Sequence, residues 1–395
     1  MKYINKYLLI TFFIAVILAL PILTKIEKSQ GVSVSENRAL AKPPVLTAEN
    51  VFSGAYLPGW NTYLSDHLWR RDDWLCCDTA IKLAAGHRVV RDVVVTPTAL
   101  LPYIASDAPD PDAEPRAAAM ADKYAALAKF TAEHGGVFLY INVPEQQSMF
   151  SGIYPAGMAT GMLRINSQDD AFAAAMAARG VNYLDMRPVF VSAAADENAL
   201  LYYARTDHHY NMRGAFLTYE TLCATLSRLG VDARVKTGAS FCTLTNTFNG
   251  SRGRKINNLN GFNDKLEYVT WDDPVPFTRF DNGALIPPLV YMMPASSEQE
   301  IEYTLYMGGD IPETIITTDR PELPNALIFG DSFTNALETV LYTSFNTTVG
   351  LDFRYNKTKS ICDYIAEYKP AVVICLRDDT ATLSADGNGG FTIDN

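Results

Sequence analysis

The segment RTDHHYNMRG, from Arg205 to Gly214, places an acidic residue directly before two histidines. The whole chain of 395 residues has only five histidines, so this pair stands out as a candidate for chemistry. In extended backbone the side chains alternate, so residues two apart point to the same side. Asp207 could therefore orient His209 as a general base, as the acid and the histidine of a serine triad do.

A metal site and a polar loop without function are the alternatives for this segment. A structural zinc site needs four ligands from Cys, His or carboxylates, and we find no matching His, Asp or Glu spacing elsewhere in the sequence. We therefore expect no metal and no cofactor. The same alternation points His208 away from Asp207. We take His208 and Arg205 as candidate contacts to a substrate.

A nucleophile for such a base is offered by LIFGDSFTNALETVL, residues 327–341. The apolar residues predict a strand that ends at Gly330 and a helix that begins at about Ser332. Ser332 would then lie at the carboxyl edge of a parallel sheet, where α/β proteins bind ligands. It would also lie at a helix N-terminus, whose free N–H groups suit a developing oxyanion. The alternative is that Ser332 only caps the helix, with help from Asp331.

The elements that must position these residues follow an α/β pattern. Helical segments such as Ala117–His134 and Gln168–Arg179 alternate with short apolar runs. The runs that predict strands are residues 137–143, 181–186, 326–330, 347–352 and 371–376. This alternation predicts a parallel sheet covered by helices on both faces. Residues 235–320 are rich in Asn, Gly, Thr and Pro, and we interpret them as a β-rich insertion.

The N-terminal region predicts a membrane anchor. Tyr7–Thr24 contains no charged residue. A helix of eighteen residues extends about 27 Å, close to the thickness of the bilayer core. Lys2 and Lys6 precede this run and favour an N-terminus inside the cell with the bulk of the chain exported.

We accordingly divide the chain into a signal anchor at 1–24, a polar stalk at 25–50 and a catalytic domain at 51–395. The small-residue pairs Ser29/Gly31 and Ser33/Ser35 leave cleavage of the anchor open, although we favour an uncleaved transmembrane helix. The expected location is the cell membrane, with a single span and an extracytoplasmic domain.

Composition argues against other classes of protein. The chain is 48% hydrophobic and 19% charged, as folded proteins are. Its formal net charge is −11 without a basic cluster, so we expect no nucleic-acid partner. Its six cysteines show no C-x-x-C spacing, which argues against zinc or redox motifs and favours buried free thiols.

The combination TDHHY…RGA with a later GDSF resembles the DHHW-motif family, which is similar to the alginate O-acetylation proteins of the SGNH-like class. The resemblance covers most of the chain from about residue 52 to residue 376. It includes the motif order, with Asp-x-His before Gly-Asp-Ser. It implies an SGNH-hydrolase-like, flavodoxin-like fold and a catalytic triad of Ser332, His209 and Asp207.

Two positions depart from that family's pattern. Tyr210 stands where the family usually has Trp, and Glu145 in YINVPEQQ stands where a Lys usually follows the Pro. Arg354 in LDFRY matches a family strand end and could stabilise an anionic intermediate or the substrate, with a structural ion pair as the alternative. Asn142, at a predicted strand end, is a candidate oxyanion donor.

The resemblance implies acyl-ester chemistry on an extracytoplasmic polysaccharide. We expect a membrane-anchored serine acyl-esterase or O-acetyltransferase that acts on a cell-envelope polysaccharide or exopolysaccharide. A membrane-bound O-acyltransferase would supply its acetyl groups, a partnership that the resemblance alone implies. The alternative is a non-catalytic envelope protein that binds a glycan on the same fold.

Overall fold

The computed structural model describes residues 2–27, 31–33, 35–36 and 38–393. It divides into two compact units, which we describe separately. Unit 1 comprises Met1–Val93 and Gly253–Gly261, and unit 2 comprises Val94–Arg252 and Phe262–Asn395. Ser29, one of the positions considered for cleavage, lies outside the described residues.

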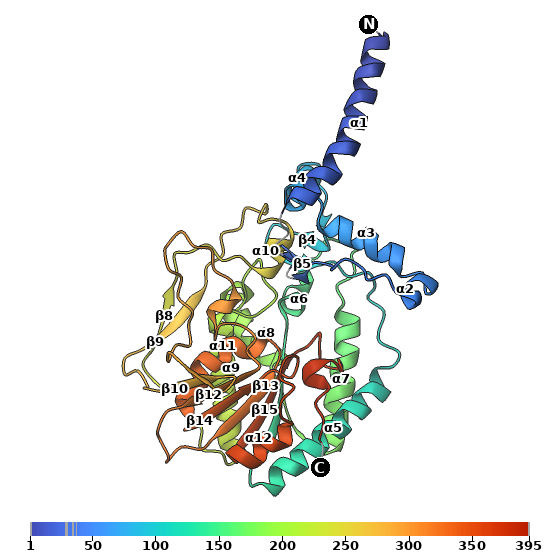
Figure 1. Cartoon of the computed structure of the whole chain (residues 1–395). Coiled ribbons are helices and arrows are strands. Elements are labelled where there is room, and N and C mark those ends of the chain that lie inside the picture. The colour runs from blue at the N-terminus through green and yellow to red at the C-terminus, as the bar shows by residue number, and fades with distance from the viewer. Residues whose placement is uncertain (1, 28–30, 34, 37, 394–395) are drawn as a thin grey trace. The chain divides into compact units, whose positions relative to one another are not determined.

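An eight-stranded sheet lies at the centre of unit 2 (Figure 1), in the order β11-β10-β12-β14-β13-β15-β6-β7. Its strands are β6 (Val137–Val143), β7 (Asn182–Asp185), β10 (Thr278–Asp281), β11 (Ala284–Ile286), β12 (Glu313–Thr317), β13 (Ala326–Gly330), β14 (Thr347–Leu351) and β15 (Val372–Asp378). The five strands from β14 to β7 pair in parallel, and β12, β10 and β11 continue the sheet as antiparallel strands. Every residue of β13, β14 and β15 is buried, as expected for parallel strands covered on both faces. The predicted parallel sheet is therefore confirmed.

Helices cover this sheet on both sides (Figure 1). The helices of unit 2 are α5 (Ala113–Glu133), α6 (Gln146–Met149), α7 (Met162–Ala178), α8 (Arg187–Glu197), α9 (Met212–Arg228), α11 (Phe333–Leu341) and α12 (Ile361–Tyr368). Apolar residues of α5, α7 and α12 form one core with alternate residues of the strands, such as Phe138, Tyr140 and Phe329. The helices α9 and α11 pack together on the other side, so the helix that follows Ser332 is wholly buried.

The β-rich region at 235–320 contributes to two sheets. Strands β8 (Ala239–Thr243) and β9 (Glu267–Trp271) form an antiparallel pair, while β10, β11 and β12 belong to the central sheet. Short 3-10 helices complete the unit: η1 (Ser151–Ile153), η2 (Ala199–Leu201), η3 (Tyr303–Leu305), η4 (Tyr342–Ser344) and η5 (Gly387–Gly389). The region is thus partly built into the main fold.

Unit 1 is mostly helical. Its elements are α1 (Lys2–Ile26), β1 (Val32–Ser33), β2 (Arg38–Ala39), α2 (Ala48–Phe52), α3 (Tyr56–Asp66), α4 (Arg71–Ala84) and β3 (Val89–Val90). Three more elements lie near the unit boundaries: β4 (Val93–Val95), β5 (Leu100–Pro102) and α10 (Ser251–Lys255). Within α1, Tyr7–Ile26 is long and apolar enough to cross a membrane.

Candidate active site

Asp207, His209 and Ser332 form one continuous chain of hydrogen bonds. The carboxylate oxygen Oδ1 of Asp207 lies 2.6 Å from Nδ1 of His209, and Nε2 of His209 lies 2.6 Å from Oγ of Ser332. Asp207 and His209 are buried, whereas Ser332 is half-buried. A serine with a base on its hydroxyl and an acid behind that base has the geometry that nucleophilic catalysis requires.

The turn between β13 and α11 presents Ser332. A Cβ atom on Gly330 would lie 2.0 Å from the carbonyl oxygen of Leu376, so only glycine allows this close approach of β13 to its neighbouring strand. The side chain of Ser332 makes no capping bond to the helix. Asp331 caps it instead, because its Oδ1 accepts from the N–H of Phe333 at 3.0 Å. The suggestion that Ser332 only caps the helix is therefore wrong.

The first turn of α11 uses most of its own N–H groups. The amide of Phe333 donates to the Asp331 side chain, that of Thr334 to the carbonyl of Asp331, and that of Asn335 to the carbonyl of Ser332. The expectation that free amides of this turn serve an oxyanion is wrong for these three residues.

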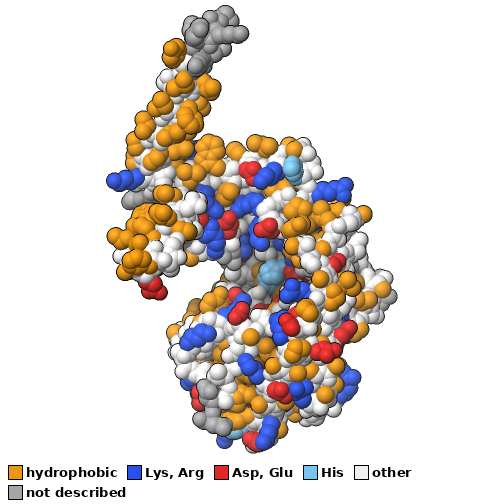
Figure 2. Space-filling model, turned by 90° about the vertical axis from the view of Figure 1, so that its right-hand side faces the viewer, with side chains coloured by type: hydrophobic (Ala, Val, Ile, Leu, Met, Phe, Trp, Pro, Cys, Tyr) orange, Lys and Arg blue, Asp and Glu red, His pale blue; other side chains and the backbone are white. Residues whose placement is uncertain are grey.

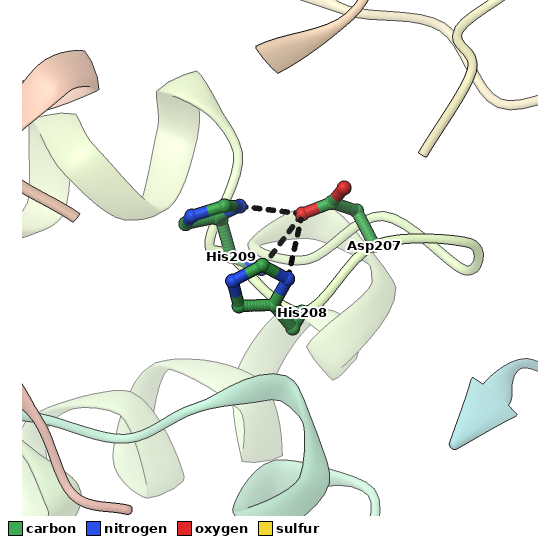
Figure 3. A group of neighbouring side chains, drawn as sticks. All are labelled: Asp207, His208 and His209. Atoms are coloured by element: carbon green, nitrogen blue, oxygen red, sulfur yellow. Dashed lines mark hydrogen bonds and ion pairs between the residues drawn. The ribbon is translucent and has the colours of Figure 1, made fainter. Parts of the chain in front are cut away.

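The segment around the two histidines is a bent loop. Residues 205–209 include bends and no strand, and the rings of His208 and His209 lie only 3.7 Å apart between centroids. Both imidazoles lie beside the same oxygen of Asp207 (Figure 3), with His208 Nδ1 at 3.7 Å from Oδ1. The prediction that His208 points away from Asp207 is wrong. His208 Nδ1 also lies 2.8 Å from the hydroxyl of Ser251.

The loop holds Asp207 as a carboxylate. Its second oxygen, Oδ2, accepts from the amide of Ser251 at 2.7 Å, and Oδ1 accepts from the amide of His209 at 2.9 Å. Burial alone would raise the pKa of Asp207, but the charges and hydrogen bonds of the adjacent histidines hold it well below its usual range. An ionised Asp207 fixes the proton of His209 on Nδ1 and leaves Nε2 to accept the serine proton.

Tyr210 ties this loop to the helix that carries the serine. Its side chain is fully buried, and its hydroxyl donates to the carbonyl oxygen of Phe333. The aromatic residue that departs from the family pattern thus joins the histidine loop to the first turn of α11.

A buried ion pair between Arg252 and Glu145 is hydrogen-bonded to the loop that contains Asp207. The guanidinium of Arg252 binds the side chains of Glu145 and Gln146, and its Nη1 also donates to the carbonyl oxygen of Asp207 at 3.3 Å. The amide of Arg252 donates to the carbonyl of Thr206 at 2.9 Å. Burial raises the pKa of Glu145, and the charge of Arg252 opposes that rise. Sequence reasoning missed Arg252, and it left Glu145 only as a departure from the pattern.

Aromatic rings enclose the imidazole of His209. Tyr303, in η3, lies parallel to it, and the ring of Phe333 lies 5.0 Å from it between centroids. The hydroxyl of Tyr303 is buried and has no hydrogen-bond partner among the described residues. Tyr303 was also missed by sequence reasoning, because nothing in its local sequence marks it.

The other predicted residues lie outside this hydrogen-bond chain. The amide of Asn142 is engaged with Asp169 and Thr382, which makes it unsuitable as an oxyanion donor in this arrangement. Arg354 forms ion pairs with Asp352 at 2.7 Å and Asp310 at 2.9 Å. Arg205 lies over the ring of Phe262 at 5.6 Å. The structural alternative given for Arg354 thus matches its contacts.

Asp207, His208 and His209 also form a group that could offer three ligand atoms to a metal ion, all within 4.8 Å of one another. Two nitrogen or oxygen ligands of a tetrahedral zinc are separated by roughly 3.3 Å, given metal–ligand bonds of about 2.0–2.1 Å. Asp207 and His209 lie closer, at 2.6 Å, which is a hydrogen-bond distance. This spacing fits an acid–base pair better than two ligands of one zinc ion.

Comparison with known proteins identifies the class of this chain. Residues 103–254 match the family model described as the SGNH hydrolase-like domain of acetyltransferase AlgX. Among curated protein sequences, none matches the chain. Bacillus cereus PatB1, solved with a sulfonyl adduct, is similar with a TM-score of 0.63 at 22% identity, covering 76% of this chain and 99% of PatB1. A DHHW family protein from Eubacterium siraeum is similar with a TM-score of 0.56 at 19% identity, covering 77% and 96% of the two chains.

The family match of residues 103–254 and the similarity to PatB1 show that the fold is SGNH-hydrolase-like. The resemblance to the DHHW-motif and alginate O-acetylation proteins, predicted from the motifs, is confirmed. The match of residues 103–254 to an acetyltransferase domain also supports the predicted class of enzyme, an SGNH-like O-acetyltransferase.

Proposed function

We propose that this chain is a membrane-anchored extracytoplasmic O-acetyltransferase or acetylesterase that acts on a cell-envelope polysaccharide or exopolysaccharide. Its catalytic residues are Ser332 as nucleophile, His209 as general base and acid, and Asp207 as the group that orients the histidine. The observation that supports this most is the continuous hydrogen-bond chain through these three side chains, with 2.6 Å at each contact of the imidazole.

The reaction has two halves. In the first, Oγ of Ser332 attacks the carbonyl carbon of an acetyl ester, and Nε2 of His209 takes the hydroxyl proton. The tetrahedral intermediate collapses, the leaving oxygen receives that proton, and acetyl-Ser332 remains. In the second half a sugar hydroxyl, or water, gives its proton to His209 and attacks the acetyl group. The proton then returns to the oxygen of Ser332, which restores the enzyme.

The developing oxyanion needs donors at the start of α11. Because the amides of Phe333, Thr334 and Asn335 already donate within the turn, we assign this task to the amide of Ser332 itself. The N-terminus of α11 adds a partial positive charge beside this amide.

Membrane anchoring and the acetyl donor complete the proposal. The apolar span Tyr7–Ile26 would hold the enzyme at the membrane. A membrane-bound O-acyltransferase would deliver acetyl groups to Ser332, as the family resemblance implies. The topology predicts that protease added to intact, wall-stripped cells digests residues 51–395, and full protection would contradict an extracytoplasmic domain.

The test of function is the acetyl content of the cell-envelope polysaccharide, measured by mass spectrometry in cells with and without the protein. Loss of acetylation without the protein supports a transferase, and a gain supports an esterase. Cells that carry Ser332→Ala should match cells that lack the protein, whereas Ser227→Ala, at an exposed serine of α9, should match the wild type. Unchanged acetylation in all strains, together with binding of the polysaccharide, would favour the non-catalytic glycan-binding alternative.

A further inference from the structure

The helices α2, α3 and α4 of unit 1 bury no apolar side chain. Among their described residues, α2 has no buried residue, α3 has only Asp66 and α4 only Thr79. Isolated helices shorter than about 12–15 residues are marginal in water, and helices in proteins gain their stability by burying an apolar face. These helices carry such faces, so another surface must cover them.

The exposed apolar residues of α3 form a stripe. Leu57 and Leu64 are exposed, and the half-buried Trp60 lies between them in sequence. The spacings of three and four residues from Leu57 to Trp60 and from Trp60 to Leu64 place these side chains on one side of α3. Phe52, at the end of α2, is 91% exposed and adds a large aromatic side chain next to this stripe in sequence.

The helix α4 has a stripe of its own. Trp74, Cys77, Ile81 and Ala84 are all exposed, with spacings of three, four and three residues. The i,i+4 ion pair between Asp78 and Lys82 adds a polar side to the helix. Exposed apolar stripes with charged residues beside them are typical of helices that lie in a membrane surface.

The candidate membrane span ends beside the turn that joins α3 to α4. The amide of Trp69 donates to the hydroxyl of Thr24 at 3.0 Å, and the amide of Arg70 donates to Glu27 at 2.9 Å. The turn between α3 and α4 is thus hydrogen-bonded to the C-terminal end of α1, where the candidate span Tyr7–Ile26 also ends. Tryptophan is enriched at this level of a membrane protein because its ring is apolar with one polar N–H group. Figure 2 shows hydrophobic side chains along α1.

We propose that α2, α3 and α4 form a membrane-docking surface, which lies in the headgroup region of the bilayer that α1 spans. The surface consists of Phe52 at the end of α2, Leu57, Trp60 and Leu64 of α3, and Trp74 and Ile81 of α4. This proposal rests on the membrane anchor of the proposed function, and it adds a second contact with the membrane, in the headgroup region. The occupant is lipid, because the turn between α3 and α4 is hydrogen-bonded to the end of the candidate membrane span within one unit.

Tryptophan fluorescence tests this surface directly. The chain has four tryptophans, and Trp60 lies on the α3 stripe away from the turn that contacts α1. We would replace Trp69, Trp74 and Trp271 by Phe in the full chain and reconstitute it in phosphatidylcholine vesicles. Lipids brominated near the headgroup should quench Trp60 more than lipids brominated near the bilayer centre. Emission equal to that in unbrominated vesicles would overturn the proposal.

A pair of variants separates docking from anchoring. Leu57→Ser with Leu64→Ser in the Trp60-only chain should reduce the quenching at least twofold while α1 keeps the protein resistant to carbonate extraction. Leu163→Ser with Val191→Ser, at residues of unit 2 that are 58% and 59% exposed, should leave the quenching unchanged.

Three other outcomes are distinguishable. Equal quenching in both variant pairs would overturn the proposal. So would crosslinked dimers or complexes that need Leu57 and Leu64 but show no quenching, since a protein would then cover the stripes. Release of the wild type by carbonate would instead contradict the membrane anchor. Circular dichroism of each variant excludes unfolding as the cause.

Discussion

The ring of Tyr303 lies parallel to the imidazole of His209, with centroids 3.9 Å apart and an angle of 7° between the planes. This stack covers one face of the proposed general base, while Asp207 and Ser332 hold its two nitrogens. The imidazole becomes a cation in each half of the proposed reaction, and an aromatic face stabilises a cation beside it. Tyr303 is thus a positioning residue for His209.

Two replacements of Tyr303 should distinguish the effect of its ring from the effect of its hydroxyl. We expect Tyr303→Leu to lower the rate of acetyl-ester hydrolysis roughly tenfold, because a cation–π contact contributes about 0.5–2 kcal/mol. Tyr303→Phe keeps the ring and should stay within about twofold of the wild type by the same reasoning. Equal losses in both variants would assign the role to the hydroxyl.

The two neighbouring histidines should differ strongly. His209→Ala should lower the rate by about 10³-fold or more, and Asp207→Asn by somewhat less, because triad members act as a unit. His208→Ala should be mild, since Nδ1 of His208 lies 2.8 Å from the hydroxyl of Ser251, whereas it is Nε2 of His209 that lies 2.6 Å from Ser332. Rates of acetyl-ester hydrolysis measure all three. An inactive His208→Ala with an active His209→Ala would show that the wrong imidazole has been assigned.

The buried ion pair of Arg252 and Glu145 should be needed as a pair. Arg252→Met leaves a buried carboxylate without its partner, so we expect a loss of about 3–5 kcal/mol in the free energy of unfolding. Arg252→Met combined with Glu145→Met removes both charges and should recover most of that loss. Urea unfolding in detergent micelles checks both variants. A double variant as unstable as the single one would contradict the ion-pair explanation.

Asp169 should make stability depend on pH. Burial raises its pKa from 3.8 to about 7, although Thr382, Arg187 and Asn142 oppose the rise. The protonated form is therefore favoured in the folded state. Its contribution to stability is full below about pH 4 and is lost as the pH rises to about 7.

Asp169→Asn should reduce the loss of stability between about pH 4 and pH 7. The urea midpoint at several pH values measures this loss. Asp170→Asn is the matched control, because the neighbouring Asp170 is exposed and should leave the pH dependence unchanged. An equal slope in wild type and Asp169→Asn would show that other groups cause the pH dependence.

Local patterns were sufficient to predict the serine turn and much of the sheet. The apolar run at 326–330 and the helical spacing after Ser332 are short-range signals, and they gave β13 and α11 nearly at their observed bounds. The helix predicted at Ala117–His134 is observed at Ala113–Glu133, since helix ends depend on capping more than on periodicity. The parallel core was predictable because its strands are apolar throughout.

The conformation of the histidine loop was beyond local reasoning. The amide and hydroxyl of Thr206 both donate to Asp264, and the amide of Ser251 donates to Asp207. These partners come from a distant part of the chain and bend a segment that its sequence predicts as extended. Tyr303 and Arg252 reach the site in the same way, because the fold of residues 235–320 brings them there. No periodicity or motif marks such contacts.

The measurement that tests the central claim most directly is peptide mass spectrometry after acid quenching of the enzyme with an acetyl ester. We expect one added acetyl group on the peptide that contains Ser332, and we expect Ser332→Ala to show neither the adduct nor ester turnover while its circular dichroism stays unchanged. An acetyl group on another residue, or ester hydrolysis by Ser332→Ala at the wild-type rate, would contradict the serine mechanism.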